Sequence, residues 1–174
     1  ALGVATTNAA SDLNESVNAI RVTFGPASRA IEQFGKTSAQ SVGLSRRAFN
    51  ELVTPIGAML RNYGLSADEA ALQTIALTQR AADMASVFNT DVSDAMTTIQ
   101  AALRGEADPI ERYGVNMSAA AVEAEAMAMG INKSWNEMTA QEKTLARLSL
   151  FFKQTDRVAG DFRRTSDEVA NAER

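Results

Sequence analysis

The 174-residue chain contains no cysteine and no histidine. Without cysteine it has no disulfide, no thiolate metal site and no thiol nucleophile. Without histidine it lacks the imidazole base of a Ser-His-Asp triad and the commonest nitrogen ligand of metal sites. The chemistry left open is that of carboxylate, lysine and tyrosine side chains, or none.

Proline and clustered positive charge are also scarce. The chain has 3 prolines and 32 alanines, a composition that favours helix. With 17 basic and 21 acidic residues it carries a net charge of -4, which argues against a phosphate-binding surface and therefore against a specific nucleic-acid site. The acidic excess falls in residues 61–130, where 4 basic residues face 10 acidic ones. Such an excess is typical of a solvated surface.

Long apolar runs are missing too. No uncharged stretch reaches the roughly 18 apolar residues of a membrane-spanning helix, and no basic segment followed by an apolar core marks a signal peptide. The chain begins with Ala1 and ends at Arg174 without a helix stop signal. We therefore expect a processed protein or a section of a longer one.

Residues 1–60 carry a heptad-like apolar pattern that predicts a helical arm. The first set of apolar residues recurs at alternating steps of four and three: Leu13, Val17, Ile20, Phe24, Ala27, Ile31 and Phe34. Gly25-Pro26 should break this helix, because proline lacks the amide hydrogen and crowds the preceding turn. A second set is expected to run on past Gly35 and Gly43: Val42, Phe49, Leu52, Ile56 and Met59. A short strand over residues 20–24 is the alternative for that segment.

Helix boundaries are better marked in residues 61–174, where we predict a compact core module. Ser66 with Glu69, and Thr139 with Glu142, have the spacing of capping boxes, in which each side chain bonds the other residue's backbone amide. The first should begin a helix that runs to about Val87. The second should begin a long helix that stops near Gly160. Further helices are expected from Asp91 to Gly105, from Asp108-Pro109 to Gly114, from Ser118 to Gly130, and from residue 161 onward.

These signals predict an all-α protein of about seven helices with short glycine- or proline-marked joints, arranged as a helical bundle or a jointed helical array. The 66–87 helix carries apolar residues on more than one side, including Leu72, Ile75, Leu77 and Met84, so we expect it to be well buried. On the helix after Ser118 we expect Val122, Ala126 and Met129 to point inward, with Met127 and Met129 as the methionines least typical of a core.

Carboxylates are among the reactive groups that remain, but their spacing predicts no site. Glu123 and Glu125 are two residues apart on a helix and cannot form a dyad. Asp91 and Asp94 lie at a helix start, where capping accounts for them. The spacing from Asn89 resembles a calcium loop, but its sixth position is Asp94 instead of glycine and its twelfth is Gln100 instead of glutamate.

The remaining charged and aromatic residues have structural interpretations. Asp108 and Arg112 have the spacing of a helical ion pair. The charges of residues 156–164 predict either a solvated helix end with local ion pairs or a polar contact site, and Trp135 is expected to hold its loop on the core. No phosphate-binding loop, dinucleotide fingerprint or nucleophile elbow is present. We therefore predict no catalytic, cofactor-binding or metal-binding residue, and no enzymatic activity.

Five blocks of sequence occur in a specific order and spacing. The most specific block joins residues 101–106 to Asp108-Pro109-Ile110 and Arg112-Tyr113-Gly114-Val115. The other blocks are residues 24–28 with 34 and 43–45, residues 81–86 with 88–89, residues 139–143, and residues 160–166 with 170–171 and 174. Together they resemble the core region of the tail tape measure proteins of long-tailed bacteriophages and prophages. The resemblance covers most of the chain but not residues 1–20, and Met138 stands where leucine would be expected.

The resemblance implies a structural role. Members of this family lie in the lumen of the tail tube, set the tail's length while it is assembled in the bacterial cytoplasm, and leave ahead of the DNA during infection. Implied partners are the tube protein, the tail-tip initiator proteins and the tail assembly chaperones, and we expect self-association. Alternatives are an unrelated helical interaction module, such as an effector or a coiled-coil adaptor, and a lytic enzyme domain.

Overall fold

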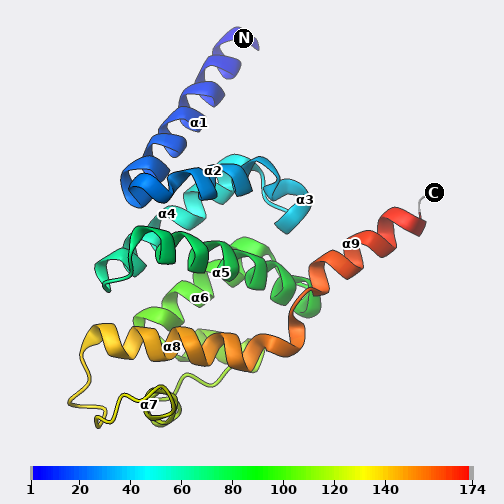
Figure 1. The fold of residues 1–174 in the computed structure, drawn as a ribbon. Coiled ribbons are helices and arrows are strands. Elements are labelled where there is room, and N and C mark those ends of the chain that lie inside the picture. Colours follow the sequence, from blue (N-terminus) through cyan, green and yellow to red (C-terminus); the bar gives the residue numbers. More distant parts are fainter. Residues whose placement is uncertain (1, 173–174) are drawn as a thin grey trace. The chain divides into compact units, whose positions relative to one another are not determined.

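The computed structural model describes the backbone of residues 2–172 and the side chains of residues 11–167. Over that range the chain forms helices and no strand (Figure 1), so the predicted all-α class is confirmed. The strand considered for residues 20–24 is wrong, because these residues complete the first helix. That helix ends at Phe24, directly before Gly25-Pro26, as predicted from the proline.

The helices are joined by short segments. The first are α1 (Leu2–Phe24), the 3-10 helix η1 (Gly25–Ala27), α2 (Ser28–Lys36), α3 (Ser38–Val42), α4 (Arg46–Asn62) and α5 (Ala67–Phe88). There follow α6 (Val92–Arg104), η2 (Asp108–Tyr113), α7 (Ala119–Ala128), α8 (Ala140–Thr155), η3 (Asp156–Val158) and α9 (Asp161–Ala172). The chain divides into two compact units, residues 1–79 and 80–174, with the boundary inside α5. The arm predicted over 1–60 falls in the first unit, and the core module predicted over 61–174 extends into both.

In the first unit, α1 packs along α4 and α2. Within the apolar pattern, Ile20 and Phe24 on α1 and Ile31 on α2 are fully buried, while Leu13 and Val17 on α1 are half-buried. Glycine allows the closest approach: a Cβ on Gly57 of α4 would lie within 2.9 Å of three carbons of the Phe24 ring. The first unit is therefore built on an aromatic ring packed directly against backbone.

The second apolar set does not continue as one helix past Gly43, contrary to the prediction. Gly43 has a φ of 71°, a left-handed conformation that ends α3 and that glycine adopts without steric cost. The buried Ser38 hydroxyl lies 3.0 Å from the carbonyl oxygen of Gly35 and 2.8 Å from that of Leu44, which holds the turn together. Ser45 then caps α4 by accepting the amide of Ala48.

In the second unit, α7 packs on α8, while α6 packs on α8 and η2. Most of the predicted boundaries are confirmed. The Thr139–Glu142 capping box is complete, and Gly105 and Gly114 end their helices with φ of 110° and 71°. The box of Ser66 and Glu69, which lies in the first unit, is also formed.

Two predicted inward residues point outward instead. Leu72 is 64% exposed, because the buried positions of this part of α5, such as Ala70, Thr74 and Leu77, lie on the opposite side of the helix. Met129 is 43% exposed, because α7 ends at Ala128 and the chain turns before Met129 can join the inward row.

Candidate functional site

Acidic side chains are the first candidates for a metal site, because the chain has no histidine and no cysteine. Within the described part of the chain, no three Asp or Glu side chains lie close enough to hold a metal ion. Asp91 occupies the N-cap position of α6, but its side chain makes no capping hydrogen bond. Asp91 therefore stabilises α6 only through the attraction between its negative charge and the positive end of the helix dipole. Asp94, in the first turn of the same helix, adds a second negative charge there.

Glu125 is a buried carboxylate, which its position in the sequence did not indicate. It is 8% exposed. Its two oxygens accept from the Ser149 hydroxyl at 2.8 Å and from the Lys153 ammonium at 2.9 Å, both on α8. The hydrogen bonds from Lys153 first and Ser149 second hold the pKa of Glu125 below its usual value. Glu125 therefore joins α7 to α8 as a charged group and is not available as a proton donor at neutral pH.

Asp83 is the second buried carboxylate that the sequence did not reveal. It lies on α5, is 8% exposed, and accepts the backbone amides of Gly160 at 2.8 Å and Phe162 at 3.1 Å. These amides belong to the start of α9. The one feature of the sequence that could have indicated burial of Asp83 is that it is the single charged residue among the small and apolar residues 81–85. Glu125 lies in a similar setting, between Ala124 and Ala126.

Further polar side chains of the second unit also reach backbone groups. Arg80 donates to the Thr155 hydroxyl at 3.0 Å and stacks on the ring of Phe152. The side-chain amide of Gln154 bonds both the amide and the carbonyl of Asn116, at 2.7 and 2.8 Å. Each such bond satisfies a backbone or hydroxyl group where two segments meet.

Arg112 does not pair with Asp108, contrary to the prediction. The segment is a 3-10 helix, in which residues three apart, not four, share a side. Arg112 instead donates to the hydroxyls of Thr98 and Tyr113, each at 3.0 Å, and the Tyr113 ring meets Phe88 edge-on. The most specific block of the resemblance thus forms an aromatic and hydrogen-bonded contact with α6 and with the end of α5.

The charges of residues 156–164 do not gather into one cluster. Arg164 pairs with Asp161 at 3.0 Å and donates to the carbonyl of Ala159, which are local contacts at an exposed helix start. Trp135 is half-buried, and the charged ends of Lys143 and Arg147 lie 4.4 and 5.5 Å from its ring centre. Both residues are on α8, so the ring does hold its loop on that helix, as expected.

The outer side of α7 is an uncharged surface. Every exposed residue of this helix is an alanine or a methionine: Ala119, Ala120, Ala124, Met127 and Ala128. Met127 is 51% exposed. The two charged residues of this helix, Glu123 and Glu125, are half-buried and buried, so its exposed side carries no charge.

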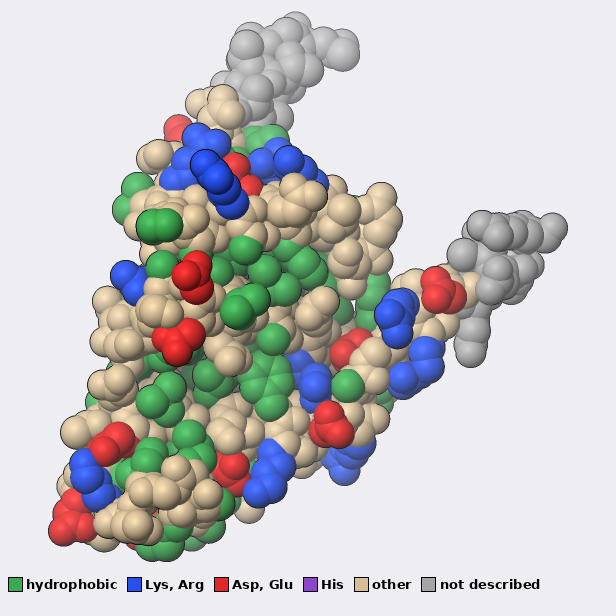
Figure 2. Space-filling model, viewed as in Figure 1, with side chains coloured by type: hydrophobic (Ala, Val, Ile, Leu, Met, Phe, Trp, Pro, Cys, Tyr) green, Lys and Arg blue, Asp and Glu red, His purple; other side chains and the backbone are tan. Residues whose placement is uncertain are grey.

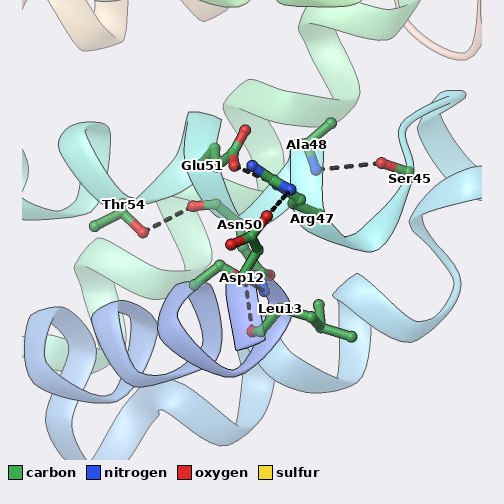
Figure 3. Close-up of polar contacts among 9 residues, drawn as sticks. Asp12, Leu13, Ser45, Arg47, Ala48, Asn50, Glu51 and Thr54 are labelled. Atoms are coloured by element: carbon green, nitrogen blue, oxygen red, sulfur yellow. Dashed lines mark hydrogen bonds and ion pairs between the residues drawn. The ribbon is translucent and has the colours of Figure 1, made fainter. Parts of the chain in front are cut away.

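In the first unit, a polar group joins α1 to α4. Figure 3 shows Arg47 directed to Asp12 on α1 and to Glu51 one turn further along α4. Beneath it the buried Asn50 donates to the Ser16 hydroxyl at 3.0 Å. The ion pairs are exposed, whereas the Asn50 bond is the buried part of this contact.

The surface carries mixed charge. The first unit has 6 basic and 6 acidic residues, and the second has 11 basic and 15 acidic. On the face shown in Figure 2, Lys and Arg side chains lie among Asp and Glu side chains.

Comparison of the chain with protein-family models, with curated proteins and with solved structures gives no match. None of the helices in the described part of the chain combines the length and the apolar character needed to cross a membrane.

Proposed function

We propose that this chain is a helical module of a bacteriophage tail tape measure protein, with a structural role and no enzymatic activity. The observation that carries the proposal is the ordered set of sequence blocks. In the second unit, blocks far apart in sequence are in contact: Asp83 of the 81–86 block bonds the Gly160 and Phe162 amides of the 160–166 block. This contact supports treating the blocks as parts of one module.

We propose that the module makes contacts during tail assembly and does not itself set the length of the tail. The longest helix, α1, has 23 residues, and at a rise of about 1.5 Å per residue it spans about 35 Å. A segment that sets the length of a tail by its own extended length would need a far longer continuous helix. We propose that the measuring sequence lies outside residues 1–174 and that this module contacts the tube protein, the tail-tip proteins or the tail chaperones within the tail lumen.

Self-association is part of the proposal, and its proposed surface is the outer side of α7 between two copies of this chain. Because each exposed residue of α7 is uncharged, two such surfaces can meet across a two-fold axis with the half-buried Glu123 as the one charge of each copy near the contact. Small alanine side chains also allow the two helices to approach closely. Glu123, which is half-buried, lies in the row between Ala119 and Met127, four residues from each.

Sedimentation of the purified chain tests the self-association. We expect a dimer whose dissociation constant rises at least tenfold in Met127→Glu. The control Ser93→Glu, at an exposed position of α6, should leave the dissociation constant unchanged. A chain that stays monomeric at all concentrations, or one that responds equally to both substitutions, would rule out this surface.

The tail role is tested in the full-length gene. In-frame deletions of increasing size outside the segment that encodes residues 1–174 should shorten the virion tail in proportion, as measured by electron microscopy. Deletion of residues 80–174 should instead prevent tail assembly. Tails of unchanged length after the first set of deletions would refute the tape measure role and favour an unrelated helical interaction module.

A further inference from the structure

The helix α9 is attached to the second unit at its first turn. Of its described side chains, Asp161 and Phe162 are half-buried, and the next five, residues 163–167, are all exposed. The contact that holds this first turn comes from a different helix, α5, about eighty residues earlier in the chain. The start of α9 is therefore positioned by tertiary contact and not by a capping residue of its own.

The Asp83 carboxylate provides that contact with both of its oxygens. Oδ2 accepts the Gly160 amide at 2.8 Å and Oδ1 accepts the Phe162 amide at 3.1 Å. Gly160 has a φ of 78°, and this left-handed turn directs both amides to the same side. The first amides of a helix have no partner within the helix, and a negative charge there also meets the positive end of the helix dipole.

Few other bonds hold α9 in place. The Ser86 and Thr165 hydroxyls lie 3.4 Å apart in an exposed position. Arg164 bonds Asp161 and the Ala159 carbonyl, which lie in and next to α9 and do not tie it to the rest of the unit. Asp83 is thus the one buried polar anchor of this helix among the described residues.

We propose that Asp83 anchors α9 in one of two positions, docked and released, so that α9 is a movable arm of the second unit. In the docked position the carboxylate accepts both amides. In the released position both bonds are broken, the arm turns about Ala159 and Gly160, and the carboxylate and the amides are hydrated instead. A partner that binds the exposed side of α9 has these two buried hydrogen bonds and the exposed Ser86–Thr165 bond to break.

The absence of native cysteine makes a distance measurement direct. Spin labels on Ser166→Cys of α9 and Ser93→Cys of α6, both exposed positions in the second unit, report the position of the arm by pulsed electron paramagnetic resonance. The parent chain should give one narrow distance distribution. Asp83→Asn should give a broad one, because the amide keeps one acceptor and turns a donor toward an amide hydrogen.

Asp161→Asn is the matched control, since it breaks the exposed pair with Arg164 and leaves Asp83 in place. Its distribution should stay narrow. A broad distribution in the parent chain, or an equally narrow one in Asp83→Asn, would overturn the proposal.

A second variant, Asp83→Ser, tests whether loss of the carboxylate disturbs α9 alone or the whole second unit. In Asp83→Ser, hydrogen exchange at the Phe162 amide should accelerate at least tenfold, the size expected for losing a helix cap. Exchange at Leu148 in the core of α8 should stay the same. Equal acceleration at both amides would show that Asp83 supports the whole unit and is not a specific anchor for α9.

Discussion

The two units of this chain hold their helices together in different ways. In the first, an aromatic ring packs against a glycine, as Phe24 does on Gly57. In the second, buried or half-buried polar side chains bond backbone and hydroxyl groups of another helix, as Asp83, Glu125 and Arg80 do. Both units also have an apolar core, which includes Phe24 and Phe49 in the first and Ile99 and Phe151 in the second. The two kinds of contact add to that core, so different substitutions should weaken each unit.

The largest effect is expected from Gly57→Ala in the first unit. The added Cβ overlaps the buried Phe24 ring, and the crowding should lower the free energy of unfolding by about 3 kcal/mol in urea denaturation. Gly35→Ala is the control, since its Cβ would meet Phe49 at 3.1 Å and alanine favours the helix there. Equal effects of the two substitutions would contradict the close-packing argument.

A smaller loss is expected from Glu125→Ala in the second unit. The Ser149 hydroxyl and Lys153 ammonium lose their buried partner, and we expect a loss of about 1.5 kcal/mol. Glu123→Ala, two residues away and without such partners, should stay within about 0.5 kcal/mol of the parent. If the two variants unfold alike, the buried charge does not stabilise this unit.

Acid should weaken the Glu125 contact by a still smaller amount. Its pKa is lowered in the folded chain, chiefly by Lys153, so its contribution is complete above the unfolded value of about 4.3 and is lost as the pH falls through the folded value. Melting temperatures between pH 7 and 3 should therefore fall less steeply in Glu125→Gln than in the parent. A parallel fall in both would show that this carboxylate gains nothing from its partners.

The smallest effect is expected from Arg47→Ala, although Figure 3 shows Arg47 between two carboxylates. Both pairs are exposed, with Arg47 itself 51% exposed, and such pairs contribute between about 0 and 1 kcal/mol. We expect a change below about 0.5 kcal/mol in urea denaturation. A loss larger than that of Glu125→Ala would mean that the first unit also depends on charge placement.

The sequence predicted the helix ends that local chemistry determines. Gly105 and Gly114 adopt positive φ, and the Thr139–Glu142 box forms because its two partners are three residues apart. The apolar pattern of residues 13–34 also identified buried positions such as Ile20 and Ile31. These features depend only on neighbours along the chain.

The contacts that depend on distant residues could not be predicted in this way. Asp83 is buried because two amides eighty residues away require an acceptor, and no local pattern carries that information. Leu72 was expected to be buried because its helix is apolar, but only the packed structure determines which side is covered. The predicted absence of a catalytic site stays a prediction.

Hydrogen exchange of the Gly57→Ala chain under native conditions tests most directly the claim that the chain contains two differently built units. The predicted result is loss of protection in α1, α2 and α4, with protection in α7 and α8 retained at the parent level. Equal loss of protection in α7 and α8 would contradict the claim, because it would show that the close packing of Phe24 on Gly57 stabilises the second unit as much as the first.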